Sequence, residues 1–143
     1  TILKELQLFK NAQLVMPGVV ALQANKFTSQ VNAQLEMTQL NEQLKSNETA
    51  LASVAQIVIC DDSSFVAQKL NNYLWVTYTR SNPSHDIYGV NDFILNKHWG
   101  CNGPMVVDAR TKPHHAPPVE KVPEVEKRID KFFEKGGSLY GII

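Results

Sequence analysis

The residues best suited to chemistry gather between positions 73 and 118 of the chain. Both tryptophans, all four histidines, one of the two cysteines and five of the seven prolines lie in this stretch. Loops dense in such residues usually carry function, because a scaffold of helices and strands holds them at the surface. Candidate metal ligands, nucleophiles and anion-binding groups are therefore expected here.

Four of these side chains raise the question of a zinc site or of thiol catalysis. His98 and Cys101 have a ligand-like spacing, and His114 and His115 follow them. A zinc site needs four ligands, or three and a water, and the sequence has neither a paired CxxC nor an HExxH motif, so we expect no metal site. Cys101 could act as a nucleophile with a histidine base. However, nothing marks a helix N-terminus that would lower the thiol pKa, so we expect no catalytic residue here.

Two polar features lie at the ends of predicted elements. Asp61 and Asp62 directly follow the apolar run 56–60, at the place where α/β folds bind ligands, but cap and turn chemistry is the favoured interpretation. Arg80 lies in a polar turn, and its guanidinium suits a phosphate or a carboxylate. An ordinary ion pair of Arg80 with Asp86 or Asp61 is the alternative, and the residues alone favour neither.

Helical and strand patterns alternate along the chain. We expect strands at 19–22, 56–60, 87–90 and 105–108, with a long loop between the last two. Helices are expected at 28–45, from an Asn47 cap to 54, at 66–77 after a Ser63 or Ser64 cap, and from Pro123 to a stop at Gly136-Gly137. A strand within 73–79 stays open as an alternative. This order predicts a three-layer α/β/α sandwich with a mixed β-sheet.

Length, composition and charge narrow the class of protein. A chain of 143 residues with 43% hydrophobic side chains predicts one domain with a real core. Fourteen basic and fourteen acidic residues cancel, which argues against a nucleic-acid partner. We expect no membrane span, no secretory signal, two free thiols and a cytoplasmic location. The missing initiator Met fits a fragment or a processed chain.

Several short motifs in a fixed order resemble one enzyme family. They are QIVICDD at 56–62, NNYLW at 71–75, TRSNP at 79–83, Asp86, DARTK at 108–112, and Pro-Glu-Val opening the last helix. The set resembles the C-terminal domain of UbiD-family decarboxylases, which are 3-polyprenyl-4-hydroxybenzoate decarboxylase-like carboxy-lyases. The resemblance implies decarboxylation of an aromatic or unsaturated acid, as in ubiquinone or menaquinone biosynthesis. It also implies prenylated FMN, held with a divalent metal and potassium.

The resemblance also implies roles for particular residues. The family's catalytic glutamate-arginine-glutamate set belongs to a preceding cofactor domain, and nothing in this chain matches it. Residues 1–143 would then be one domain that serves assembly and active-site closure, with 1–15 as a candidate linker helix from the missing domain. Arg80 matches an arginine near the cofactor phosphate, while Asp108 and Lys112 match structural positions. The segment 93–101 takes the place of the substrate-mouth loop, through Phe93, Leu95, His98, Trp99 and Cys101.

The last helix and the tail are the expected contacts of a homo-oligomer. The apolar residues Val125, Ile129, Phe132 and Phe133 form one stripe, and the segment SLYGII ends the chain. In this interpretation the full-length protein is the enzyme, and the chain alone binds no cofactor and is inactive. The alternatives are a stand-alone interaction or regulatory module of the same fold without catalysis and, more remotely, a small hydrolase using Cys101.

Overall fold

A five-stranded mixed sheet forms the centre of the computed structural model, which describes residues 2–117 and 122–142. The strand order is β1-β2-β3-β7-β4. Strands β2, β3 and β7 are parallel, and β1 and β4 pair antiparallel to them at the two edges. The bounds are β1 Lys10–Met16, β2 Val19–Gln23, β3 Gln56–Cys60, β4 Ile87–Gly89 and β7 Met105–Asp108.

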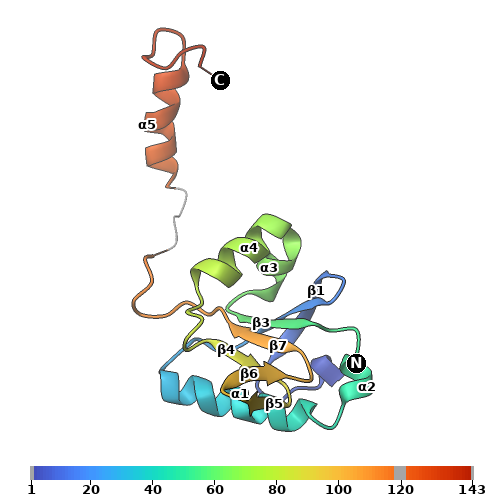
Figure 1. The fold of residues 1–143 in the computed structure, drawn as a ribbon. Coiled ribbons are helices and arrows are strands. Elements are labelled where there is room, and N and C mark those ends of the chain that lie inside the picture. The colour runs from blue at the N-terminus through green and yellow to red at the C-terminus, as the bar shows by residue number, and fades with distance from the viewer. Residues whose placement is uncertain (1, 118–121, 143) are drawn as a thin grey trace.

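Helices cover both faces of this sheet (Figure 1). On one face lie the 3-10 turn η1 (Ile2–Lys4), α1 (Gln30–Leu44) and α2 (Glu48–Leu51), and on the other lie α3 (Ser63–Gln68) and α4 (Leu70–Thr79). Successive side chains of β3 point to opposite faces, so Ile57 and Ile59 join the first core while Val58 and Cys60 join the second. The continuous apolar run of β3 is therefore that of a central strand, and the predicted α/β/α sandwich is confirmed.

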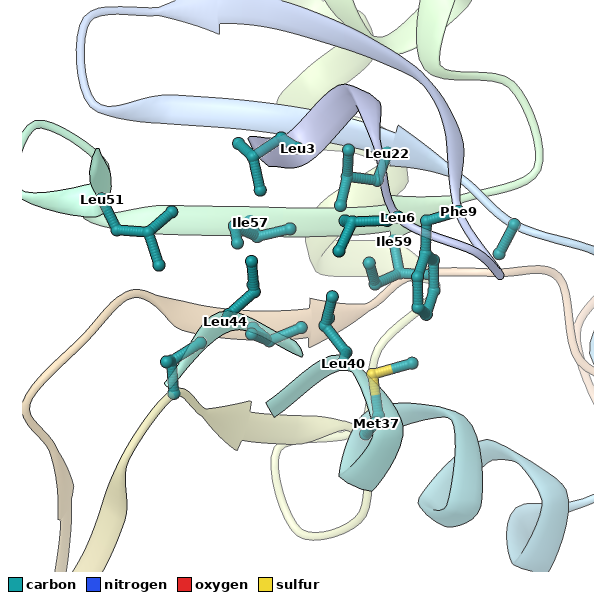
Figure 2. Close-up of a cluster of buried hydrophobic side chains, with 13 residues drawn as sticks. Leu3, Leu6, Phe9, Leu22, Met37, Leu40, Leu44, Leu51, Ile57 and Ile59 are labelled. Atoms are coloured by element: carbon teal, nitrogen blue, oxygen red, sulfur yellow. The ribbon is translucent and has the colours of Figure 1, made fainter. Parts of the chain in front are cut away.

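Helix α1 supplies one wall of the larger core. Ser29 caps the helix by accepting a hydrogen bond from the backbone N–H of Asn32 at 3.2 Å. Figure 2 shows Met37, Leu40 and Leu44 pointing from α1 toward the β-sheet. Val31 and Leu35, two further apolar residues of α1, are instead exposed, because α1 turns only one narrow face to the sheet.

The linker helix expected at 1–15 is wrong for the described residues of that segment, which begin at Ile2. After the short η1 turn, the chain enters β1, an edge strand paired with β2. The register between the two strands shifts twice, between Lys10 and Gln13 and between Leu14 and Met16. Such irregularities disturb the alternation that would have identified a strand from sequence. Lys10–Met16 is therefore part of the domain's own sheet.

The expected helix at 66–77 is split into two. Helix α3 begins at Ser63, and its cap is Asp62, whose Oδ1 accepts from the backbone N–H of Phe65 at 3.0 Å; neither predicted serine is the cap. Lys69 then takes an extended conformation, with φ −150° and ψ 147°, between α3 and α4. Asn72 Nδ2 donates to the carbonyl of Phe65 at 2.9 Å, which satisfies a backbone acceptor freed by the break. The strand alternative at 73–79 is wrong.

Two further elements complete the described chain. A separate two-stranded sheet, β5 (Asp92–Leu95) and β6 (His98–Cys101), lies where a long loop was expected. Helix α5 (Pro123–Phe133) begins at Pro123 as predicted and ends before Gly136, which has a φ of +93°. Both cysteines are free thiols. None of the helices in the described ranges is long and apolar enough to cross a lipid bilayer.

Candidate functional site

The polar residues of the chain meet at the carboxyl ends of the parallel strands. Asp61 follows β3, and Thr111 follows β7, which is hydrogen-bonded to β3. The backbone N–H and the hydroxyl of Thr111 both donate to Oδ2 of Asp61 at 2.8 Å. This edge is where open α/β sheets bind ligands, since loops and helix ends converge there.

Arg80 joins this edge from the end of α4. Its Nη1 lies 3.4 Å from Oδ2 of Asp61, and its guanidinium carbon lies 4.8 Å from the ring centroid of Trp75. The ion pair with Asp61 is therefore formed, whereas Asp86 pairs with Lys112 at 3.3 Å instead. The contact with Asp61 is long and uses one nitrogen, so the guanidinium keeps donors for a further acceptor.

Beneath this edge lies a buried charge cluster. Part of it, the DARTK motif at 108–112, was noted in the sequence, but the cluster itself was not predicted. Arg110 forms a two-pronged contact with Asp108, from Nε to Oδ1 at 2.9 Å and from Nη2 to Oδ2 at 2.7 Å. Its Nη1 lies 2.7 Å from Oε2 of Glu36 and donates to the carbonyl of Asn25 at 3.1 Å. Burial lowers the pKa of Arg110, but the hydrogen bonds and charges of Asp108 and Glu36 outweigh it and leave the pKa raised.

Lys112 connects the buried charge cluster to the C-terminal end of α4. Its Nζ donates to the carbonyls of Asp108 at 2.8 Å and Arg80 at 3.1 Å and pairs with Oδ2 of Asp86. Both partners of this ion pair are buried, so Lys112 holds the turn after Arg80 against β7. These contacts agree with the structural role that the sequence resemblance implied for Asp108 and Lys112.

A depression of about 440 Å³ opens next to these groups. It is lined by Lys26, Phe27, Asp61, Arg80, Thr111, Lys112 and Pro113. The ring of Phe27 forms its apolar wall, backed by Arg110 and Lys112 at 5.7 Å and 5.4 Å from the ring centroid. With Lys26 and Arg80 at its rim, the depression can accept one edge of an anionic ligand, such as a phosphate.

The predicted substrate-mouth residues lie on the β5–β6 hairpin rather than on a loop. None of the five lines the depression beside Arg80, so the structure does not bring the two sets together. Strand alternation places Phe93, Leu95 and His98 on one face, with Trp99 and Cys101 on the other. Trp99 Nε1 donates to Oδ2 of Asp92 at 3.3 Å.

Neither thiol is prepared for nucleophilic attack. Burial, and then the charge of Asp92, raise the pKa of the Cys101 thiol above its ordinary value. Burial, and then the charge of Asp61, raise the pKa of the Cys60 thiol to about 12. A reactive cysteine needs a lowered pKa, so the hydrolase alternative finds no support. Among the residues that the structure describes, no group of three or more His, Cys, Asp or Glu side chains could hold a metal ion.

His115 is part of the turn that carries Thr111 and Lys112. Its Nδ1 accepts a hydrogen bond from the backbone N–H of Lys112 at 3.0 Å, which requires an unprotonated Nδ1. Burial, and then the charges of His114 and Lys112, lower the pKa of His115 below its ordinary value of 6.5. The folded chain therefore prefers the neutral imidazole.

A pH dependence of stability follows from this preference. Because the unfolded chain binds the His115 proton more readily, we expect the free energy of unfolding to fall as the pH drops below about 6.5. The fall should end below the folded-state pKa. Urea denaturation between pH 5 and pH 8, with an NMR titration of the His115 ring, measures both quantities. His115→Asn keeps an acceptor for the backbone N–H of Lys112 but does not titrate, so it should remove this part of the pH dependence. A measured His115 pKa at or above 6.5 in the folded chain would contradict the preference for the neutral imidazole.

Comparison with known proteins gives two partial sequence matches, while no protein-family model matches the chain. An uncharacterized protein of Chlamydia muridarum (strain MoPn / Nigg) is 29% identical over 97 residues, covering 68% of this chain and 17% of that protein. One subunit of the 4-hydroxybenzoate decarboxylase of Chlamydia pneumoniae is 27% identical over 81 residues, covering 57% of this chain and 14% of that protein. The chain thus spans less than a fifth of the length of these relatives.

A solved structure of a larger enzyme contains a similar fold. The evolved dimeric form of the UbiD-class enzyme HmfF from Pelotomaculum thermopropionicum, in complex with prFMN, matches with a TM-score of 0.50 and 14% identity. The match covers 89% of this chain and 26% of that one. The vanillic acid decarboxylase ShVdcCD of Sedimentibacter hydroxybenzoicus in open form gives a TM-score of 0.40 at 15% identity, over 81% of this chain and 27% of that one, which is too low to establish a shared fold. The resemblance to UbiD-family decarboxylases is confirmed.

Proposed function

We propose that this chain is the C-terminal domain of a UbiD-type decarboxylase that acts on an aromatic or unsaturated acid of the kind used in quinone biosynthesis. The proposal rests on the sequence similarity to one subunit of a 4-hydroxybenzoate decarboxylase, and the fold shared with a UbiD-class enzyme supports it. The role proposed for the domain is assembly and closure of the active site. The reacting groups would lie in the cofactor domain that precedes it in the longer protein.

The state of the titratable groups favours a structural rather than a chemical role. The buried charges of Asp108 and Arg110 are paired with each other, and that of Lys112 is paired with buried Asp86. Burial raises the pKa of Tyr73 and of Tyr88 to about 12, with the neighbouring Tyr78 contributing at Tyr73 and the charges of Asp108 and Asp86 at Tyr88. Groups that must move protons near neutral pH have pKa values near the working pH, and these do not.

In this proposal the depression beside Arg80 meets the phosphate edge of the cofactor. The side chains fit such a contact, because Lys26 and Arg80 supply positive charge. Asp61, which accepts a hydrogen bond from Thr111, pairs with the guanidinium of Arg80 and holds it in place. Prenylated FMN, with a divalent metal and potassium, would be held mainly by the cofactor domain, where it supplies the electron sink for decarboxylation. The β5–β6 hairpin would cover the substrate mouth.

The natural full-length protein provides the test. Reconstituted with prenylated FMN, it should release carbon dioxide from an acid such as 4-hydroxybenzoate, whereas the 143-residue chain alone should neither retain the flavin nor release carbon dioxide. Arg80→Met in the full-length protein should weaken cofactor binding about 10- to 100-fold, the value of a charge-assisted hydrogen bond. Lys10→Met, an exposed position on the edge strand β1 away from the depression, is the matched control. Turnover by the short chain alone, or unchanged cofactor binding in Arg80→Met, contradicts the proposal.

A further inference from the structure

The guanidinium of Arg80 lies between an aromatic ring and a carboxylate. Its carbon atom is 4.8 Å from the ring centroid of Trp75, which is within the range of a cation–π contact. On another side, its Nη1 is 3.4 Å from Oδ2 of Asp61. Only 18% of the Arg80 side chain is exposed, although it carries a full charge. Two neighbours of different chemistry therefore restrain this side chain.

The carboxylate supplies only part of this restraint. Oδ2 of Asp61 also accepts hydrogen bonds from the backbone N–H and the hydroxyl of Thr111, both at 2.8 Å, and these are shorter than its contact with Arg80. A carboxylate oxygen offers about two lone pairs, and the two short bonds from Thr111 use them. The ion pair with Asp61 therefore holds the guanidinium nearby without fixing its orientation by itself.

The backbone of Arg80 is fixed more firmly than its side chain. Arg80 follows the last residue of α4, with φ −110° and ψ 4°, and its N–H donates to the carbonyl of Val76 at 3.2 Å. Its own carbonyl accepts from Nζ of buried Lys112 at 3.1 Å. These contacts set the point from which the side chain starts, but a long side chain has several staggered rotamers from any such point. The rotamer that borders the depression must therefore be selected by contacts of the side chain itself.

We infer that Trp75 is a positioning residue, whose ring holds the Arg80 guanidinium in the orientation in which its free N–H groups meet an anionic edge. Stacking uses the face of the guanidinium and leaves the donors at its rim available. Trp75 is 44% exposed, so filling the core does not account for its ring. It is not among the residues that line the depression, so it acts through Arg80. The inference rests on the proposed function, in which the anionic edge is the cofactor phosphate.

A double-mutant cycle in the natural full-length protein tests this role. Titration of the apoprotein with prenylated FMN, followed by the absorbance of the flavin, gives dissociation constants for Trp75→Leu, Arg80→Met and the combined variant. Trp75→Leu should weaken binding about 3- to 10-fold in the parent, the range of a cation–π contact. It should have no effect in the Arg80→Met background, since no guanidinium then remains to be held. Trp75→Phe keeps an aromatic face and should retain most of the affinity.

Tyr78→Leu is the matched control, because Tyr78 is an exposed aromatic residue of the same helix whose ring contacts Tyr73 instead. Three results overturn the inference alone while Arg80→Met still binds weakly: a loss in Trp75→Leu no greater than in the control, an equal loss in Trp75→Phe, or a loss that persists in the Arg80→Met background. If Arg80→Met binds the cofactor as tightly as the parent, the proposed function fails as well. Thermal denaturation checks the fold of each variant, and Trp75→Gln takes the place of Trp75→Leu if the leucine variant is unfolded.

Discussion

Replacing Arg110 by methionine is expected to lower the free energy of unfolding by about 3–5 kcal/mol. Arg110 is 1% exposed and Asp108 is 0% exposed, so the substitution leaves a carboxylate in the interior without its cation. The loss of the ion pair with Glu36 should contribute less to the destabilisation, because the Glu36 side chain is 26% exposed and can turn to water. Chemical denaturation followed by circular dichroism measures the change.

Two further variants separate the lost pair from the lost side chain. Arg128→Met makes the same substitution on the exposed surface of α5 and should change stability by less than about 0.5 kcal/mol. Asp108→Leu combined with Arg110→Met removes both charges and should recover a large part of the loss, since no buried charge is then unpaired. A loss below about 1 kcal/mol in Arg110→Met would show that Asp108 finds another partner or takes up a proton.

The parts of the fold that the sequence predicted are those in which the local signals agree with one another. Strand β3 is β-branched, apolar on both faces and central, and helix α5 has proline at its start and glycine after its end. In such elements one physical requirement dominates at every position. The central strand, the long helix α1 and the mixed sheet were predicted for this reason.

The errors fall where local signals conflict. The β5–β6 hairpin turns at Asn96 and Lys97, with φ values of +50° and +68°. The usual sequence signal for such a turn is Asn-Gly, and lysine in the second place conceals it. Strand β1 is an edge strand with two register shifts, so its apolar residues fit neither a helix nor a regular strand. The break at Lys69 involves neither glycine nor proline and depends on contacts made after folding.

The candidate site was predictable only in outline. The position of Asp61 after a buried strand and of Arg80 at a helix end indicated a polar edge, and their ion pair was among the alternatives weighed. The contacts of Arg110 were not foreseen, because its acceptors at Asn25 and in α1 lie far away in sequence. Sequence spacing shows which charges follow a strand, but it does not show which of them the packing will bury together.

Leu40→Ala should destabilise the chain by about 2–5 kcal/mol, the usual cost of removing a buried leucine side chain. Leu40 is 1% exposed and lies in the core formed by α1 and the sheet, together with Ile57 and Ile59 (Figure 2). A close-packed interior relaxes only partly around the cavity, so both the lost transfer free energy and the lost contacts contribute.

Leu35→Ala provides the matched control, since the same substitution is made in the same helix at a side chain that is 58% exposed. Helix propensity changes equally in the two variants, so the difference between them isolates burial. Guanidinium denaturation should shift the midpoint strongly for Leu40→Ala and little for Leu35→Ala, with the slope unchanged in both. Equal losses would mean that α1 does not turn this face to the sheet. A non-cooperative transition in the parent chain would mean that these residues require the rest of the longer protein to fold as a unit.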